Sequence, residues 1–206
     1  MTADRLDRTF FSRDTLAVAR DLLGKRLVRL LAEGQRLSGI IVETEAYVGE
    51  TDRACHAARG RTPRNAVMYE KAGLAYVYLI YGIHHCLNAV TEQEGFPAAV
   101  LIRALEPQEG LAKMREFRSG QPDRILTSGP GRLCQALAID RTFNGSDLCI
   151  SPDLYVEEGD APAGIVTDTR IGISADETAR ERLWRFCVAG NLYVSRPPRN
   201  RGTKVE

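Results

Sequence analysis

The chain has 206 residues, of which 44% are hydrophobic and 27% are charged. This size and balance indicate an ordinary globular domain and exclude an intrinsically disordered or membrane-embedded chain. The formal net charge is only +1, which excludes binding to a polyanion through overall charge, so any nucleic-acid contact must come from a local basic patch.

The first predicted elements are a helix and a hairpin. Residues 14–24 combine helix-spaced apolar residues with a terminal glycine and a capping residue in Ser12 or Asp14, which predicts a helix. Residues 25–31 and 37–47 alternate or run apolar on either side of a Glu-Gly-Gln turn. We therefore predict that a β-hairpin follows the helix.

An irregular segment then leads into a buried sheet. Residues 48–72 are rich in Gly, Arg, Thr and Pro and show little periodicity, so we expect a surface segment with one short helix. Irregular segments of this length are often functional. Apolar and aromatic runs at 74–81, 86–90 and 98–103 predict three neighbouring strands of one sheet.

The second half of the chain predicts shorter elements. Ser128 and Pro130 form a helix-start pattern whose N-terminus could face a phosphate. The other elements are helices at 109–118 and 175–182 and strands at 154–156, 164–168 and 185–189. Because there is no repeat or linker, we expect one α+β domain over 1–206, with a basic tail at 197–206 that is either disordered or DNA-binding.

The cysteines and the N-terminus bear on location. The five cysteines contain no C-x-x-C pair, which favours reduced thiols over disulfides or a zinc site. The N-terminus is charged where a signal peptide needs an apolar core, and the run at 74–81 is too short to span a membrane. We expect a protein that is not secreted and has no membrane partner, located in a bacterial cytoplasm or nucleoid, or in a eukaryotic nucleus.

Two carboxylates on one strand are the most unusual feature. Strand alternation puts Glu43, Glu45 and Tyr47 on one face, with about 7 Å between successive same-face positions. Taken alone, such a pair is more often solvent-exposed than catalytic. If that face is buried, one acid must be paired, protonated or working on a ligand.

Tyrosines at 76, 78 and 81 allow two interpretations. Tyr76 and Tyr78 could be core residues with satisfied hydroxyls, or flat faces on which a base stacks. Tyr81 precedes Gly82, and a large aromatic beside a turn glycine is suited to protrude from a loop.

Metal and phosphate motifs are weak or missing. His56, His84 and His85 have no metal-ligand spacing, and Gly129-Pro-Gly131 lacks the ending of a P-loop. We expect no metal and no organic cofactor.

Five strings in the chain carry a family resemblance. They are Val-Glu-Thr-Glu-Ala-Tyr (42–47), Thr-Pro-Arg-Asn (62–65), Tyr-Val-Tyr-Leu-Ile-Tyr-Gly (76–82), Leu-Ile-Arg-Ala-Leu-Glu-Pro (101–107) and Ser-Gly-Pro-Gly-Arg-Leu-Cys-Gln-Ala-Leu (128–137). In this order and spacing they resemble the alkyladenine (3-methyladenine) DNA glycosylase family, over about residues 11–196. The resemblance implies that the protein hydrolyses the bond between a damaged purine and its deoxyribose.

The resemblance assigns roles that strand geometry leaves open. It implies that Glu45 is the general base and that Glu43 is structural or supporting. Arg103 matches the arginine that helps to hold the catalytic water and a nearby phosphate, which suits a guanidinium with several directed donors.

The same resemblance implies the residues that hold the base. Tyr47 and Tyr78 match aromatics that sandwich the flipped base, and His56 matches a residue on the opposite wall. Asn88 matches a side chain that obstructs the amino group of normal guanine, while Tyr81 matches the wedge that fills the space left in the duplex.

The expected partner is double-stranded DNA that contains a damaged purine. Contacts with the DNA backbone are expected from Arg59, Arg61 and Arg64 in the irregular segment and from the helix start at Ser128, and salt should weaken them. No lysine lies in the matched strings, so we expect an abasic product without an imine or strand cleavage. The family also implies a mainly antiparallel curved sheet flanked by helices, like the barrel of formyltransferase C-terminal domains, and we expect a monomer.

Two alternatives belong to other classes of protein. A non-catalytic damage-binding or RNA-binding module would keep the tyrosines without requiring Glu45. A nucleoside or carbohydrate glycosidase would use Glu43 and Glu45 as its pair without requiring a wedge at Tyr81.

Overall fold

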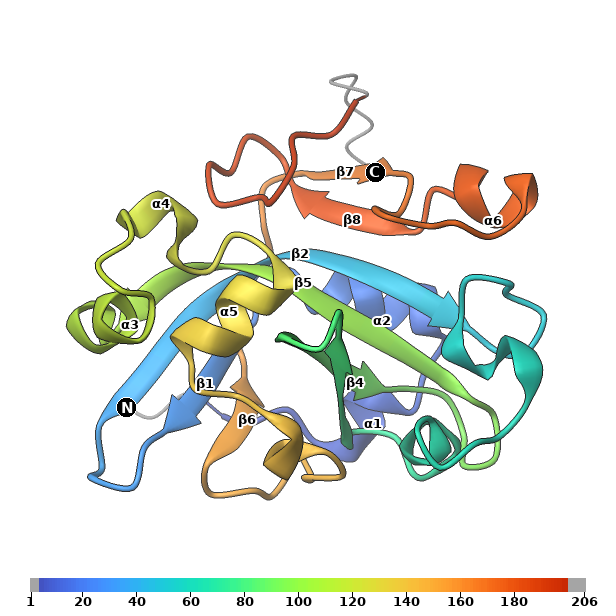
Figure 1. Ribbon diagram of the computed structural model, residues 1–206, viewed down its shortest axis with the longest axis horizontal. Helices are drawn as coiled ribbons and strands as arrows, with labels where there is room; N and C mark the ends of the chain where they lie inside the picture. Colours follow the sequence, from blue (N-terminus) through green and yellow to red (C-terminus); the bar gives the residue numbers. More distant parts are fainter. Residues whose placement is uncertain (1–3, 200–206) are drawn as a thin grey trace.

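The computed structural model describes residues 4–199, which are built around one eight-stranded sheet (Figure 1). Its strands are β1 (Arg26–Leu30), β2 (Arg36–Val48), β3 (Ala75–Ile80), β4 (His84–Val90), β5 (Ala98–Glu109), β6 (Leu154–Glu157), β7 (Ile165–Asp168) and β8 (Arg185–Val188). Six of them follow the order β3-β4-β5-β2-β1-β6, and all pairs are antiparallel.

The long strand β2 organises the sheet because it pairs with three partners. One edge pairs with β5 along most of its length. The other edge pairs first with β1, up to Ile40, and then with β8, from Glu43 to Glu45. The sheet therefore forks beside Glu43, and Figure 1 shows β7 and β8 on one side of the long β2 and β5 ribbons and β1 and β6 on the other.

Short helices cover both faces of the β2–β5 pair. Helix α2 packs against β2 and β5, where Thr44 Oγ1 donates to the carbonyl of Ala19, while α5 packs against β4 and β5 (Figure 1). The α-helices are α1 (Arg8–Phe11), α2 (Thr15–Asp21), α3 (Leu111–Phe117), α4 (Asp123–Leu126), α5 (Pro130–Ala136) and α6 (Glu177–Glu181), and the 3₁₀ turns are η1 (His56–Arg59), η2 (Ala66–Tyr69) and η3 (Arg141–Phe143).

Apolar side chains form one large core and two smaller clusters. The large core lies between the sheet and helices α2 and α5, and it includes Phe11, Leu22 and Leu87, all fully buried. A second cluster around Met68 and Tyr76 lies between β3, β5 and the irregular segment. This second cluster matters for function because it supports the aromatic cavity described below.

The structure confirms the expected mixed α+β class with a mainly antiparallel sheet. The expectation of a barrel is wrong: the sheet stays open, since β3 and β6 end the strand order and have no pairing with each other within residues 4–199. Ser128 is not the cap of its helix, because Gly129 holds that position. No helix in the same range is long and apolar enough to cross a membrane.

The cap of α2 gives a first test of the fold. Asp14 accepts a hydrogen bond from the Ala17 N–H at 2.9 Å, as the helix-start pattern predicts. Asp14→Ala is therefore expected to lower the free energy of unfolding by about 1 kcal/mol, measured by urea denaturation. Asp14→Asn keeps an acceptor and should stay within a few tenths of a kcal/mol of wild type; equal losses in the two variants would contradict the capping role.

Candidate active site

A cavity of about 190 Å³ opens on one face of the sheet. Alternation along β5 points Ala99, Leu101 and Arg103 into it, and neighbouring strands contribute from the same face. From these strands come Tyr47 of β2, Tyr76, Tyr78 and Ile80 of β3, and Cys86 and Asn88 of β4. The remaining walls come from Ala54, His56, Met68, Pro130 and the segment 171–173.

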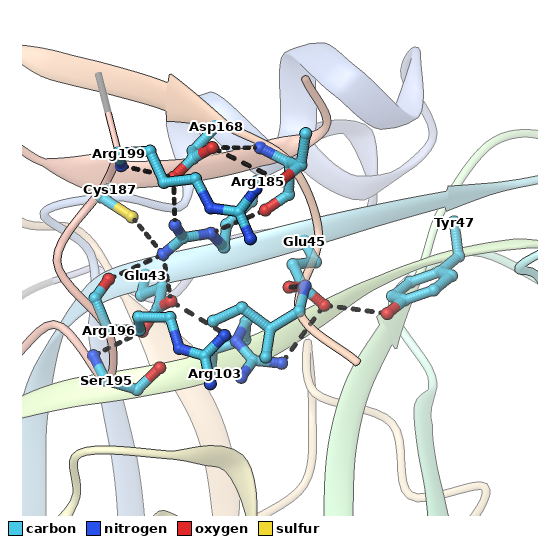
Figure 2. Close-up of polar contacts among 12 residues, drawn as sticks. Glu43, Glu45, Tyr47, Arg103, Asp168, Arg185, Cys187, Ser195, Arg196 and Arg199 are labelled. Carbon is cyan, nitrogen blue, oxygen red and sulfur yellow. Dashed lines mark hydrogen bonds and ion pairs between the residues drawn. The ribbon is translucent and has the colours of Figure 1, made fainter. Parts of the chain in front are cut away.

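Glu45 lies directly behind this cavity and has no exposed surface. Its Oε1 accepts from the Ile171 N–H at 2.7 Å. Its Oε2 accepts from the Tyr47 hydroxyl at 2.8 Å and from Arg103 Nη1 at 3.2 Å (Figure 2). The three donors all belong to residues that line the cavity. When it is ionised, the carboxylate therefore has one acceptor position on Oε1 that none of the described residues occupies.

Glu43 is also fully buried, so the exposed pair that the residues alone favoured is wrong. Its Oε1 lies 2.9 Å from Arg185 Nη1 and 3.4 Å from Arg103 Nε, and its Oε2 accepts from the Ser195 N–H at 2.7 Å (Figure 2). Arg185 also binds Asp168 at 2.7 Å. Glu43 is therefore part of an ion-pair network, and its charge is already matched by two guanidinium groups.

Arg103 is shared by the two carboxylates because of an irregularity in the sheet. The β2–β5 register shifts on both sides of Glu43, and Arg103 is skipped in the Cα pairing. Such irregularities re-aim side chains. Burial alone lowers the pKa of Arg103, but the charges of Glu45 and Glu43 raise it above its ordinary value, so the guanidinium stays cationic.

Tyr47 joins the aromatic wall to the carboxylate. Its burial, together with the charge of Glu45, raises the pKa of its hydroxyl well above the ordinary value. The phenol therefore stays protonated at neutral pH and donates to Glu45.

A histidine and two tyrosines form the other aromatic group. His56 Nδ1 lies 2.8 Å from the Tyr76 hydroxyl, and the His56 ring meets the Tyr78 ring edge-on with 4.5 Å between centroids. The protein atoms around His56 and the charge of Arg64 lower the pKa of the imidazole. At neutral pH the imidazole is therefore uncharged and adds no positive charge to this wall of the cavity.

Asn88 is buried at the floor of the cavity between β3 and β5. Its Nδ2 donates to the Tyr76 carbonyl at 2.9 Å, which fixes the orientation of the side-chain amide. A fixed polar group on a cavity floor can accept or reject a ligand by the hydrogen bonds it offers.

Tyr81 stands at the tip of the β3–β4 hairpin and is 85% exposed. The Ile83 N–H donates to the Ile80 carbonyl across a turn in which Tyr81 (φ 54°) and Gly82 (φ 72°) both have positive φ. Left-handed backbone is uncommon for a bulky residue and is found disproportionately at functional sites. The turn presents a large aromatic side chain to solvent.

The arginines expected at the DNA backbone differ in their surroundings. Arg59 is exposed, Arg61 pairs with Glu70 at 2.7 Å, and Arg64 donates to the Leu79 carbonyl and lies over the Tyr78 ring. Ser128 is buried, which does not favour contact with DNA. For all four residues, contact with the DNA backbone stays a prediction.

Several residues of the site had no signal in the sequence. Ile171, Gly172 and Ile173 form a cavity wall, and Arg170 before them is buried against Asp52. These residues match no motif, and they reach the site through the pairing of β8 with β2 and through their own contacts with Glu45, Ala46 and Asp52. Tyr76 did have a signal, its place on the face of Tyr78, but it was not among the expected site residues.

Within residues 4–199, no group of three or more His, Cys, Asp or Glu side chains lies close enough together to hold a metal ion. The five cysteines are free thiols. Independence from metals and cofactors stays a prediction.

An aromatic cavity, a buried carboxylate held by residues of its lining and a hairpin that presents an exposed tyrosine are the features expected of a hydrolase that acts on a base taken out of a nucleic acid. The family described as Methylpurine-DNA glycosylase (MPG) matches residues 9–192. The chain therefore belongs to the methylpurine-DNA glycosylase family, and it is a DNA glycosylase, as the five strings predicted.

Close relatives agree with this assignment. Proteins with the provisional name 3-methyladenine DNA glycosylase are 54% identical in Methanocella arvoryzae, 48% in Desulfitobacterium hafniense and 45% in Alkaliphilus oremlandii. Each alignment covers 93% of this chain and 96% to 99% of the relative. The two alternative classes are not supported, and the contacts of Glu43 argue separately against an exposed glycosidase pair.

Proposed function

We propose that this enzyme extrudes an alkylated purine from duplex DNA and hydrolyses its N-glycosidic bond with a water molecule activated by Glu45. The enzyme is a DNA glycosylase of base excision repair that removes alkylated purines such as 3-methyladenine. The observation that carries the mechanism is the buried Glu45 carboxylate, held at three points directly behind an aromatic cavity.

The size of the cavity suits a single base. Its volume of about 190 Å³ is below the range of roughly 300–1,000 Å³ typical of sites for drug-sized ligands. Tyr47 and Tyr78 stack on the extruded base, and a cationic alkylpurine gains an additional cation–π attraction of about 0.5–2 kcal/mol. Asn88 rejects normal guanine at its amino group, and the neutral His56 completes the wall.

Charge develops on the sugar as the base departs. The deoxyribose becomes oxocarbenium-like, so a nearby carboxylate can both deprotonate the attacking water and stabilise the positive charge. Glu45 has a free acceptor position for that water, and Arg103 and Tyr47 hold the carboxylate in orientation.

The product is an abasic site in an intact strand. No lysine is among the residues that line the cavity, so no amine is positioned to form an imine with the sugar. Activity as a monomer without metal or cofactor stays a prediction, as do the contacts of Arg59, Arg61 and Arg64 with phosphates. The similarity of the fold to formyltransferase C-terminal domains also stays a prediction, and it does not include a closed barrel, because the sheet is open.

The proposal is tested with duplexes that contain one alkylated purine, one ethenoadenine or one hypoxanthine. After incubation with the enzyme, hot alkali should cleave the strand at the lesion, whereas the untreated strand should stay intact. Release of none of these bases would contradict the proposed function, and cleavage without alkali would contradict the monofunctional mechanism.

Tyr81 gives a separate prediction. If it fills the gap left by the extruded base, Tyr81→Ala should lower excision from duplex DNA by about 10- to 100-fold, since unstacking a base costs a few kcal/mol. Excision from a single strand should fall much less. Leu192→Ala removes another apolar side chain, 69% exposed, and should leave both rates unchanged. If Tyr81→Ala excises the base from duplex DNA at the wild-type rate, Tyr81 does not act as the wedge.

A further inference from the structure

Arg170 lies outside the cavity and joins three of its parts. The side chain is fully buried. Nη1 donates to Asp52 Oδ2 at 2.5 Å and to the Ala46 carbonyl at 2.9 Å, while Nη2 donates to Asp52 Oδ1 at 2.8 Å and to the Ala179 carbonyl at 3.1 Å. A two-pronged ion pair with two added carbonyl acceptors fixes a guanidinium in position and orientation.

The same guanidinium packs against two aromatic rings. Its central carbon lies 4.8 Å from the Tyr47 ring centroid and 5.1 Å from that of Trp184. Tyr47 lines the cavity but Arg170 does not, so the cation contacts the tyrosine from outside. The position of the Tyr47 ring therefore depends on Arg170.

Asp52, the partner of Arg170, anchors the loop that carries His56. Its carboxylate accepts from the Val48 N–H at 3.3 Å and the Ala54 N–H at 3.2 Å, and its carbonyl accepts from the Cys55 N–H at 2.8 Å. His56 follows directly. The ion pair thus links the aromatic wall at Tyr47 to the wall at His56.

The third connection is along the backbone. Arg170 immediately precedes Ile171, whose N–H donates to Glu45 Oε1 at 2.7 Å. Fixing the guanidinium restricts the position of this amide, and with it the carboxylate.

We infer that Arg170 is a positioning residue that sets Tyr47, His56 and the Ile171 amide in the relative geometry that base excision requires. The inference rests on the proposed function of the cavity. A small displacement of reacting groups can cost about 100-fold in rate even when the altered residue does not touch the substrate. Loss of Arg170 should therefore slow the chemical step more than it weakens DNA binding.

The test compares Arg170→Lys with Arg36→Lys. Arg36 makes a similar two-pronged ion pair with the buried Glu157, at 2.6 and 3.0 Å, and it does not line the cavity. With enzyme in saturating excess over a lesion duplex, Arg170→Lys should lower the single-turnover rate about 10- to 100-fold, and the dissociation constant should change about threefold or less. Arg36→Lys should keep the wild-type rate.

Two further measurements separate positioning from loss of fold. Trp184 is the single tryptophan of the chain, and its ring lies against Arg170 at 5.1 Å and Arg182 at 4.2 Å. Its emission spectrum should therefore change in Arg170→Lys but not in Arg36→Lys. Asp52→Asn keeps the shape of the partner while removing its charge. Asp52→Asn should also slow excision, while its secondary structure should match that of the wild type. This variant tests the inference even if Arg170→Lys does not fold.

The outcomes are distinct. Wild-type rates in both Arg170→Lys and Asp52→Asn would overturn the inference while leaving the proposed function intact. An equal loss of rate in Arg36→Lys would also overturn it, because the effect would then be general. If the wild-type enzyme releases no base, both the proposed function and this inference are wrong.

Discussion

Glu45→Gln is expected to lower the single-turnover rate of base release by about 10²- to 10⁴-fold, the usual contribution of general acid–base catalysis. Binding of lesion-containing duplex should change little, because the glutamine has the same shape and the cavity walls are untouched. The rate is measured by alkaline strand cleavage with enzyme in excess, and binding by titration of a labelled duplex.

The contacts of Glu45 explain why an amide cannot replace it. Three donors converge on its two oxygens, from Ile171, Tyr47 and Arg103. An amide NH₂ group would have to face at least one of them, at a cost of about 1–3 kcal/mol for an unsatisfied buried group. The thermal midpoint of Glu45→Gln must therefore be recorded, and the rate compared only where both proteins are folded.

Glu43→Gln is the matched control two residues away on the same face. Glu43 is held by Arg185, Arg103 and the Ser195 N–H, so its replacement should affect stability more than the chemical step. An active Glu45→Gln enzyme beside an inactive Glu43→Gln enzyme would reverse the assignment of the general base.

The fold was predictable where local patterns are strong. The helix at 14–24 and the hairpin at 25–47 were confirmed as α2 and β1–β2, because a cap, periodic apolar residues and a turn act over short distances. The helices α1 and α4 were missed, since four residues are too few for a periodic signal. Strand β5 continues to Glu109 because pairing with β2 extends it past the apolar run that ends at Arg103.

The site was predictable where its residues share a strand or a motif. Tyr47, Tyr78, Asn88 and Arg103 all line the cavity, and alternation explains their common face. The burial of Glu43 and Glu45 was not predictable from alternation, because it depends on β8 pairing with β2 from more than a hundred residues away. The same long-range pairing brings in Ile171 and Arg185.

The C-terminal segment also makes long-range contacts that local sequence patterns do not predict. Residues 197–206 were expected to be disordered or DNA-binding, and this stays a prediction. Just before and at the start of that segment, the Arg196 carbonyl accepts from Arg185 at 2.9 Å and the Arg199 N–H donates to Asp168 at 2.8 Å. This part of the chain therefore closes the ion-pair network next to Glu43. Residues 200–206 lie outside the described range.

Arg185→Met is expected to lower the free energy of unfolding by about 3–5 kcal/mol, measured by urea denaturation at neutral pH. Arg185 is 1% exposed and neutralises two buried carboxylates, Glu43 at 2.9 Å and Asp168 at 2.7 Å. Methionine fills similar space without charge, so Asp168 loses its cation and Glu43 keeps only Arg103, at 3.4 Å. Arg115→Met removes one partner of an exposed pair with Asp123 and should leave the midpoint nearly unchanged.

The pH dependence of this variant provides an independent check. Burial alone raises the pKa of Asp168, but hydrogen bonds from the Arg199 and Thr169 N–H groups and the charge of Arg185 hold it below its ordinary value of 3.8. A lowered folded-state pKa contributes stability that is present above the unfolded pKa and is lost as pH falls through the folded one. The stability gap between wild type and Arg185→Met should therefore be full at neutral pH and should narrow as the pH falls from about 3.8 towards the lowered folded-state pKa of Asp168, because a protonated acid no longer needs a cation. A gap that stays constant down to acid unfolding would mean that Arg185 stabilises the protein by packing and not by charge.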